Sequence, residues 1–527
     1  MSSFAVVLIM PLRPQDLPED RDQLVSLALA QAAEIDALKA GMKVLEGLVY
    51  GARSERSVTI ADGQLALDLG DLRRAPPPVA ANDTAGPASG LKRSGSKRNI
   101  GRLPAWLPRV DEVLEPDTKT CACCSGALHK IGEDVSEALD VVPAVIRIVR
   151  TIRPKYACRG CRTGVVQSRS RGRLFDGAMA TTSLIASIAC WKYAWHLPLS
   201  RQAHMLRGQG VRLDRSTLCR WIKRAAWWLK PLYLRQLELI HQQPRLFCDE
   251  TRLPVRRKGR RRTHTGQFWA HAVDDRPWGG PAHPAVIYVF AEGRSAREIR
   301  EQLKDYAGLL QVDGYAAYKG LAHPNRKPGP VTLAFCLAHA RRKFFEAHKT
   351  TGSNFCADVL GRIAQIYAIE ADVRGQDAAI RLAARRGRTA PILEALRSDL
   401  DAELEGLSKQ SGLSKAIRYT LAHWTGLTRF LEDGRLEVDN NTVERTMRSI
   451  SLGRKNHLFA GDDGGAESWA ILASLLNTAK LNDLDPFVWL NDVLERMVSG
   501  AVKANELDSL LAWNWKAERL APLQAAA

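Results

Sequence analysis

Near the start of the chain, apolar positions recur every three or four residues, with mostly polar residues between them. The recurring positions are Leu24, Ala28, Gln31, Ile35, Leu38, Met42, Leu45 and Val49. This spacing is the a/d pattern of a short coiled coil, so residues 20–56 are predicted to form an N-terminal helix that dimerises. An amphipathic helix packed against its own chain is the alternative, because Gln31 and the alanines make a weak seam.

Residues 72–107 have no such periodicity and are rich in Pro, Gly, Ser, Lys and Arg. This composition predicts a flexible basic linker, which can contact phosphates without sequence preference. The linker leads into a cysteine-containing segment, residues 111–170, whose chemistry is considered below.

Residues 178–232 have the pattern of helices, with a tight break at GQGV and a following helix that Asp214 or Ser216 would cap. The second helix carries basic side chains on one polar face: Arg215, Arg220, Lys223 and Arg224. Two helices joined this closely resemble a DNA-binding helix-turn-helix, although any pair of antiparallel helices has the same pattern. Three tryptophans of this helix are expected in the core rather than stacked on bases: Trp221, Trp227 and Trp228.

From residue 240 the pattern changes to short apolar runs bounded by turn residues. Three successive strands are predicted in PRLFCDETRLPV, GQFWAHAVDD and HPAVIYVFAEG, then a helix in SAREIREQLKDY, then strands that lead into helices in GLLQVDGYAAY and VTLAFCLAHARRKF. Three strands in a meander, a helix and a further strand are the order of a ribonuclease H-like α/β core. We therefore predict a multidomain α/β protein with a catalytic domain at 240–479, a helical insertion at about 345–430 and a C-terminal helical segment at 480–527.

Three acidic residues stand out in this region. Asp249 lies on the first predicted strand and Asp313 at the end of the fourth, so the two can be neighbours in space. Glu444 begins a helix after the helical insertion, and four basic residues follow it: Arg445, Arg448, Arg454 and Lys455. Carboxylates brought together in apolar surroundings are the oxygen ligands that small divalent cations require.

Each acid also has a structural explanation. Asp313 and Gly314 form a dipeptide that is common in hairpin turns, and Asp249 can cap a turn. Glu444 is spaced from Asn441 as in a capping box, and it is four residues before Arg448, which favours an ion pair on a helix. The metal-site interpretation rests on the three acids taken together.

The charge composition indicates the kind of partner that the protein binds. The 527 residues include 76 Lys and Arg against 57 Asp and Glu, a net charge of +19, which suits a polyanion such as nucleic acid or an anionic membrane. No apolar run reaches the length of a membrane-spanning helix, and the opening FAVVLIM is too short for a signal peptide. We therefore expect a soluble, cytoplasmic, nucleoid-associated protein whose partner is double-stranded DNA.

Four of the ten cysteines form two C-x-x-C pairs, Cys121 with Cys124 and Cys158 with Cys161. Two such pairs supply four thiolates for a tetrahedral zinc ion, and a closed four-thiolate site is structural because it leaves no position for water. Cys123 makes the choice of ligands slightly ambiguous. A redox C-x-x-C is the competing interpretation, but the thioredoxin-like βαβ context is absent.

Several motifs resemble those of the transposases of the insertion sequence 66 family. They are CDET, QVDGYAAY, CLAHARRKF, FLEDGRLEVDNNTVERTMRSISLGRKNHLFAG and LDPFVWLNDVLERM in the second half of the chain, and LVYGARSERS, the cysteine pairs and KYAWHLPLSRQ in the first. The resemblance implies a DDE transposase with a ribonuclease H-like domain, in which Asp249, Asp313 and Glu444 are the acidic triad. His339 and Arg342, which lie in one of these motifs, are left without a role.

The chemistry agrees with this resemblance. Cleaving a phosphodiester and joining its 3′ hydroxyl to another strand are in-line displacements, which two Mg²⁺ ions, or Mn²⁺, promote at both oxygens. We expect all three acids to bind these ions, and Arg445, Arg454 and Lys455 to contact phosphates. We expect the protein to act as a homo-oligomer, because two DNA ends must be synapsed. Small accessory proteins of the same element are further possible partners. The alternatives are a catalytically inactive DNA-binding repressor and a structure-specific nuclease without strand transfer.

Overall fold

The computed structural model of the chain describes residues 146–157, 165–167, 172–175, 177–257, 259 and 262–525. All of them belong to one compact unit, Leu69–Ala527. The predicted coiled coil at 20–56, the linker at 72–107 and the four predicted zinc ligands lie outside the described residues. Among the described residues, no helix has the length and apolar character needed to cross a membrane.

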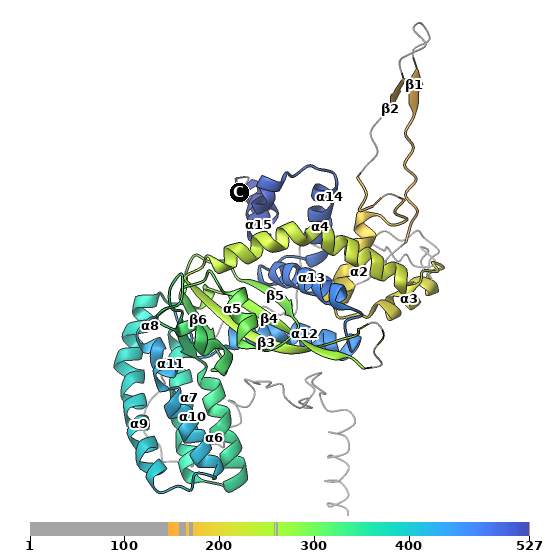
Figure 1. The fold of residues 1–527 in the computed structure, drawn as a ribbon. Coiled ribbons are helices and arrows are strands. Elements are labelled where there is room, and N and C mark those ends of the chain that lie inside the picture. Colours follow the sequence, from red (N-terminus) through yellow and green to blue (C-terminus); the bar gives the residue numbers. More distant parts are fainter. Residues whose placement is uncertain are drawn as a thin grey trace, which may run out of the picture. The chain divides into compact units, whose positions relative to one another are not determined.

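A five-stranded mixed sheet forms the centre of this unit (Figure 1). Its strands are β3 (Arg245–Val255), β4 (His264–Val273), β5 (Ala285–Ala291), β6 (Leu309–Val312) and β7 (Thr332–Phe335), in the spatial order β5-β4-β3-β6-β7. The first three strands pair antiparallel, whereas β6 pairs parallel with both β3 and β7. The five predicted strands and helix α5 (Ala296–Gln302) between β5 and β6 are thus confirmed.

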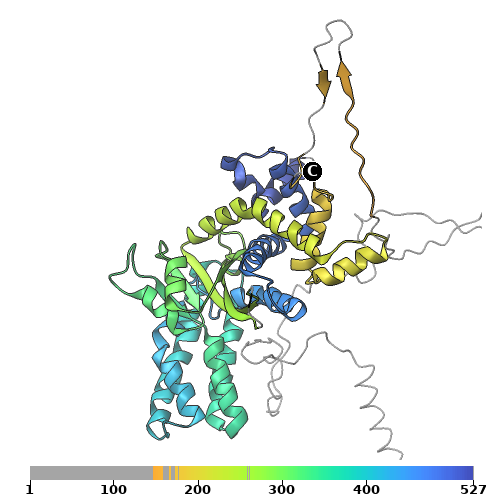
Figure 2. The same cartoon turned by 45° about the vertical axis from the view of Figure 1, so that its right-hand side comes forward.

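Long helices pack on the sheet (Figures 1 and 2). Helix α12 (Asn441–His457) contacts β3 and β4, and α13 (Asp463–Leu481) contacts β5 and the long helix α4 (Arg215–His241). The hydroxyl of Ser474 accepts a hydrogen bond from the Tyr288 amide at 2.7 Å, and that of Thr478 accepts one from Val286 at 3.1 Å. Helix α13 thereby satisfies backbone groups of the edge strand β5 that would otherwise be open to pairing with another chain.

A series of helices directly follows β7, in the region where the helical insertion was predicted at about 345–430. It comprises α6 (Leu337–Thr351), α7 (Asn354–Asp372), α8 (Ala378–Ala384), a π-helical turn (Arg385–Thr389), α9 (Ala390–Glu405), α10 (Gly412–Ala422) and α11 (Trp424–Thr428). These helices extend away from the sheet as a bundle (Figure 1). They enclose a hydrophobic core of their own, to which Phe344, Ile363 and Ile417 contribute, so the insertion adds a second centre of stability beside the sheet.

The remaining strands and helices lie toward the two ends of the described chain, and short 3₁₀ turns connect elements along it. They are the antiparallel pair β1 (Lys155–Ala157) and β2 (Val165–Gln167), the helices α2 (Thr182–Tyr193), α3 (Leu199–Gly208), α14 (Pro486–Val498) and α15 (Ala512–Ala525), and the 3₁₀ turns Arg276–Trp278, Ala316–Ala322, Arg429–Leu431 and Ala504–Leu510. Helix α4 begins after Asp214, as predicted, and continues past Pro231 to His241. The helix therefore links the predicted DNA-binding region to the sheet without an interruption.

Candidate active site

Two of the three predicted acids lie on adjacent parallel strands. Asp249 is in the middle of β3, and Asp313 directly follows β6. The β3–β6 register pairs Phe247 with Gln311, and continuing it by two residues brings Asp249 beside Asp313. Since β6 also pairs parallel with β7, Asp313 and Gly314 do not form a hairpin turn, and that alternative is wrong.

Burial and like charge act on Asp249 together. Burial raises the pKa of this carboxyl well above its ordinary value, and the nearby charges of Glu250, Glu444 and Asp313 raise it further. The backbone amide of Glu250 donates to Asp249 Oδ1 at 2.9 Å, which opposes the rise. A buried carboxyl surrounded by other carboxyls is unfavourable in its charged form unless a cation balances the charge.

Glu444 lies in the first turn of α12, and its side chain is 15% exposed. Burial raises its pKa to about 7, Asp439 and Asp313 add to the rise, and Arg342 and Arg448 oppose it. Its Oε1 atom has no hydrogen-bond partner among the described residues. A buried, unpaired carboxylate oxygen beside other carboxylates fits a divalent cation, so the residues present suit the expected metal.

The capping-box interpretation of Glu444 is wrong. Helix α12 has Asn440 at its N-cap, Asn441 is already the first helical residue, and the Asn441 amide donates to Asp439 at 2.6 Å. Asn440 instead fixes the helix to the sheet, because its Nδ2 donates to the Cys248 carbonyl at 3.0 Å. This contact holds the start of α12 next to the residue that precedes Asp249.

The backbone after Asp313 is held in a conformation that needs glycine. Gly314 has φ +94°, and the Tyr419 hydroxyl donates to the Asp313 carbonyl at 3.0 Å. A Cβ atom at Gly314 would lie 3.1 Å from that hydroxyl and 3.3 Å from His423 Cδ2. Both the backbone angle and the available space therefore favour glycine beside the acid.

We expect Gly314→Ala to lower the free energy of unfolding by about 1–2 kcal/mol, because alanine is strained at positive φ and its methyl group displaces Tyr419. Asp313 should shift with the backbone, so activity should fall as well. Thermal unfolding measures the first effect. Gly320→Ala is the control, since its Cβ would meet nothing within 4 Å, and an equal loss in both variants would contradict the explanation.

A further carboxylate, Glu250, follows Asp249 and is already paired with an arginine. Its oxygens accept hydrogen bonds from Arg294 Nε at 2.6 Å and from the Tyr318 hydroxyl at 2.8 Å. The Arg294 guanidinium also lies 3.9 Å from the centre of the Tyr315 ring, two residues after Asp313. Sequence reasoning missed this cluster, although the Asp-Glu dipeptide was a signal that two acids share one strand.

His339, which sequence reasoning left without a role, lies at the site, and so does Cys336, which sequence reasoning did not single out. His339 Nδ1 lies 3.8 Å from Glu444 Oε1. Ligand-type atoms of Cys336, His339 and Glu444 all lie within 4.8 Å of one another. Burial lowers the pKa of His339, and nearby Asp313 opposes this fall. The spacing C-x-x-H at the start of a helix was the available signal, because it places both side chains on one turn.

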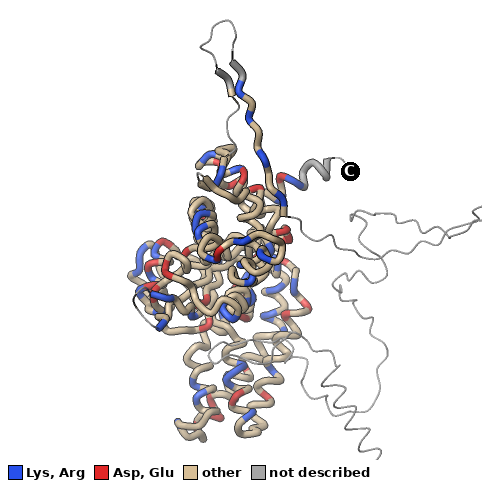
Figure 3. The backbone as a smooth tube through the Cα atoms, turned by 90° about the vertical axis from the view of Figure 1, so that its right-hand side faces the viewer, with Lys and Arg blue, Asp and Glu red and all other residues tan. Residues whose placement is uncertain are grey.

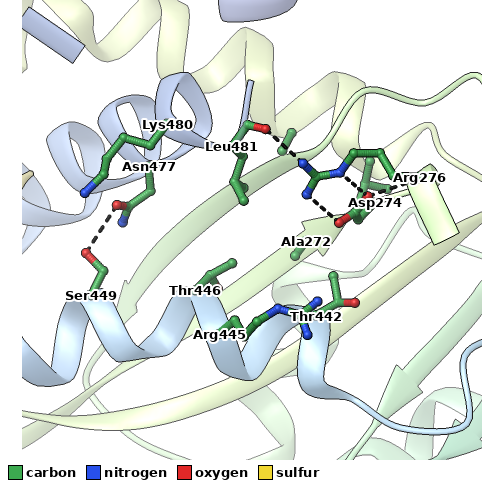
Figure 4. A pocket seen from close by; sticks show the side chains of 12 residues that line it. Ala272, Asp274, Arg276, Thr442, Arg445, Thr446, Ser449, Asn477, Lys480 and Leu481 are labelled. Atoms are coloured by element: carbon green, nitrogen blue, oxygen red, sulfur yellow. Dashed lines mark hydrogen bonds and ion pairs between the residues drawn. The ribbon is translucent and has the colours of Figure 1, made fainter. Parts of the chain in front are cut away.

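The basic residues that follow Glu444 differ in their surroundings. Arg454 donates to Thr251 Oγ1 at 3.1 Å and to the Arg252 carbonyl, so it joins α12 to β3. Arg445 lines a pocket of about 280 Å³ between α12, α13 and β4, which Lys480 and Asn477 also line (Figure 4). Lys455 is exposed near the end of α12.

The four basic residues predicted to contact DNA on α4 are all exposed. Lys223 pairs with Asp462 at 2.7 Å, and Arg224 donates to the Leu174 carbonyl at 3.1 Å. Lys and Arg also recur along the extended segment at 146–157 (Figure 3). Positive charge thus lines several separate elements rather than one face of a single helix.

The tryptophans of α4 do not all lie in the core. Trp221 is buried, and Trp228 is partly buried and donates to the Leu174 carbonyl at 2.8 Å. Trp227, however, is 57% exposed and lies under the Arg224 guanidinium at 4.6 Å, so its predicted core position is wrong. On a helix of 27 residues that packs along one side, three neighbouring tryptophans cannot all face inward.

Comparisons with known proteins match most of the chain. Residues 177–468 match the family described as Transposase IS66 family, residues 118–162 match the zinc-finger binding domain of transposase IS66, and residues 474–513 match the IS66 C-terminal element. Two relatives from Sinorhizobium fredii (strain NBRC 101917 / NGR234) are named Uncharacterized protein y4jD and Uncharacterized protein y4qI. The first is 54% identical over 97% of this chain and 99% of its own length, and the second 38% identical over 97% and 100%.

The zinc-finger match spans the four cysteines predicted to bind zinc, and the largest match contains the three acids of the candidate site. The three matched segments follow one another along the chain in the order zinc-finger domain, transposase region and C-terminal element. The chain therefore belongs to the IS66 transposase family.

Proposed function

We propose that this protein is a metal-dependent DNA transposase, which cleaves phosphodiester bonds at the ends of an insertion element and transfers the 3′ hydroxyl ends to target DNA. The observation that carries the proposal is the convergence of Asp249, Asp313 and Glu444 from β3, the end of β6 and α12 in a half-buried site. The pKa values of Asp249 and Glu444 are raised by burial and by the neighbouring carboxylates, and such a cluster has a function when the carboxylates share divalent cations.

The strand order supports a ribonuclease H-like catalytic domain. Three antiparallel strands are followed by a helix and then by two strands parallel to the first, in the spatial order β5-β4-β3-β6-β7. In such an open sheet, the carboxyl ends of the parallel strands are where ligands bind. Asp313 lies at one of these ends, and the helical insertion begins at the next.

The protein's residues would hold the reacting groups in place. Asp249, Asp313 and Glu444 would bind two Mg²⁺ ions, or Mn²⁺, which activate the attacking oxygen and stabilise the leaving oxygen. The Arg294 side chain forms an ion pair with Glu250, so a cation already balances this acid beside the three others. The Oε1 atom of Glu444 is buried, and its low exposure to water strengthens its attraction for a cation.

DNA contacts would come from several places. We infer that α3 and α4 act as a helix-turn-helix, with Arg215 and Arg220 at the DNA, while Arg445 and Lys455 contact phosphates near the acids. Zinc bound by the four cysteines would stabilise the segment that contains them. A homo-oligomer is expected because two element ends must be held together, and accessory proteins of the same element are possible partners in the nucleoid.

We expect Lys455→Ala to weaken DNA binding equally for the element's ends and for shuffled DNA, because a phosphate contact carries no sequence information. The salt slope, which is the change in the logarithm of the binding constant with the logarithm of the salt concentration, should be smaller by about one because one phosphate contact is lost. Fluorescence anisotropy at several salt concentrations measures both. Lys415→Ala, an exposed lysine on α10 of the insertion, is the control. If Lys455→Ala had the same salt slope as the wild type, Lys455 would not contact a phosphate.

A strand-transfer assay on the wild-type chain tests the proposed function. DNA that carries the element's own ends is compared with shuffled ends, in the presence and absence of Mg²⁺. We expect joined products only with the element's ends and Mg²⁺. Binding without cleavage would instead indicate a repressor with an inactive core, and cleavage without joining would indicate a nuclease.

A further inference from the structure

The side chains of His339 and Glu444 face each other without forming a hydrogen bond. His339 lies in the first turn of α6, which directly follows β7, and Glu444 lies in the first turn of α12, so the starts of two helices meet at one point. The atoms His339 Nδ1 and Glu444 Oε1 face each other at 3.8 Å, too far apart for a hydrogen bond. Both atoms are buried, and neither has a hydrogen-bond partner among the described residues.

A shared metal ion accounts for this arrangement. Two atoms bound to one ion at about 2.1 Å each lie about 3 to 4 Å apart, which includes the observed separation. Two unpaired buried polar atoms otherwise cost free energy, because each has left water without gaining a partner. A cation between them satisfies both atoms at once.

Cys336 belongs to the same cluster but has a different part in it. Its buried sulfur accepts a hydrogen bond from the Asn440 backbone amide at 3.2 Å. This bond joins the start of α6 to the residue that precedes α12, which holds His339 and Glu444 at their separation. We therefore assign Cys336 as a positioning residue and not as a ligand.

We propose that His339 supplies a nitrogen ligand to the metal ion held by Glu444, and that this position consequently prefers Mn²⁺ over Mg²⁺. The inference rests on the proposed function, because it concerns the same metal site. Imidazole nitrogen suits transition metals, whereas Mg²⁺ prefers oxygen ligands and keeps its water. A site built only from the three carboxylates would show a weaker preference of this kind.

Pulsed electron paramagnetic resonance of Mn²⁺ bound to the tag-free, full-length protein tests the proposal. We expect nitrogen coupling in the wild type and in His323→Gln, whose histidine is exposed outside the site, and no coupling in His339→Gln. Mn²⁺ affinity in His339→Gln should fall by at least about tenfold, the loss already typical of removing an outer-shell partner. Nitrogen coupling that persists in His339→Gln, or unchanged Mn²⁺ affinity, would overturn the proposal.

His339→Asp is a second variant, which replaces the nitrogen by an oxygen ligand. We expect it to bind metal but to favour Mg²⁺ more than the wild type does, and a preserved Mn²⁺ preference would count against a role for the imidazole. Nitrogen coupling in a wild type that joins no DNA would support His339 as a ligand and reject the transposase activity.

Discussion

Strand transfer by Glu444→Gln is expected to fall by about a thousandfold or more, while the protein itself becomes more stable in the absence of Mg²⁺. The loss of activity follows from removing a carboxylate from a site that must hold cations against two reacting oxygens. Glutamine has nearly the same shape as glutamate, so α12 should keep its position on β3. The strand-transfer assay with Mg²⁺ measures this first effect.

The variant Glu444→Gln is expected to gain stability while it loses activity, because the buried carboxylate itself destabilises the folded protein. Burial and the charges of Asp439 and Asp313 raise the pKa of Glu444 to about 7 from an ordinary value of 4.5. The folded protein thus keeps a proton that the unfolded chain has lost, so the wild type loses stability as pH rises from about 4.5 to about 7. Above pH 7 the loss from this group approaches about 3 kcal/mol, and Glu444→Gln avoids it.

Unfolding of both proteins at several pH values measures the second effect. Buffers should be freed of Mg²⁺ by a resin, since a strong chelator would also remove zinc from the predicted cysteine site. At pH 4 the two proteins should be equally stable, and at pH 8 the variant should be the more stable. Glu467→Gln, an exposed acid on α13, is the control and should change neither property. If Glu444→Gln joined DNA ends as well as the wild type, Glu444 would not be a metal ligand.

The strands were predictable because apolar runs bounded by turn residues are a local property of the sequence. The positions of Asp249 and Asp313 followed from the order of these strands, since residues on adjacent parallel strands meet at one edge. The place of Glu444 at the start of α12 also followed from a local helix pattern. Their common metal role remains a prediction, on which the proposed function depends.

Contacts between distant segments were not predictable in the same way. His339 reaches Glu444 only because α6 and α12 start at neighbouring points, and no periodicity in either helix indicates this. Arg454 was expected to contact phosphates, but its position on α12 places its guanidinium against Thr251 and the backbone of β3. A charged side chain on an amphipathic helix can be identified from sequence, whereas its partner depends on the packing of the whole helix.

The arginines of the helical insertion are the strongest example. Arg381 and Arg385 lie in the stretch RLAARRGR, which has the composition of an exposed basic face, yet both are 1% exposed or less. Arg385 donates to both oxygens of Glu370 at 2.7 and 2.6 Å and to the carbonyl of Leu436 at 2.8 Å. Arg381 donates to Glu437 at 2.7 Å. The two arginines thus fix the segment that leads into α12.

We expect Arg385→Met to lower the free energy of unfolding by about 3–5 kcal/mol, because it leaves Glu370 without its two-pronged partner in the interior. The carbonyls of Phe430 and Leu436 also lose a donor. Urea unfolding measures the loss. Arg388→Met is the matched control, since Arg388 lies three residues further along and pairs with Asp372 at the surface, with side chains 52% and 59% exposed. Its cost should be below about 1 kcal/mol.

The effect should also reach the acids. Glu437 accepts a hydrogen bond from Arg381 through its side chain and one from the Gln311 side-chain amide, at 2.8 Å, through its backbone carbonyl. Gln311 precedes Asp313 by two residues, so this segment is connected to the acids. Loosening this segment should therefore lower the Mn²⁺ affinity of folded Arg385→Met, measured well below its unfolding temperature. Replacing Glu370 by Met as well removes the unpaired charge and should restore part of the stability. If the double variant were no more stable than Arg385→Met, the cost would come from the lost carbonyl contacts rather than from the buried charge.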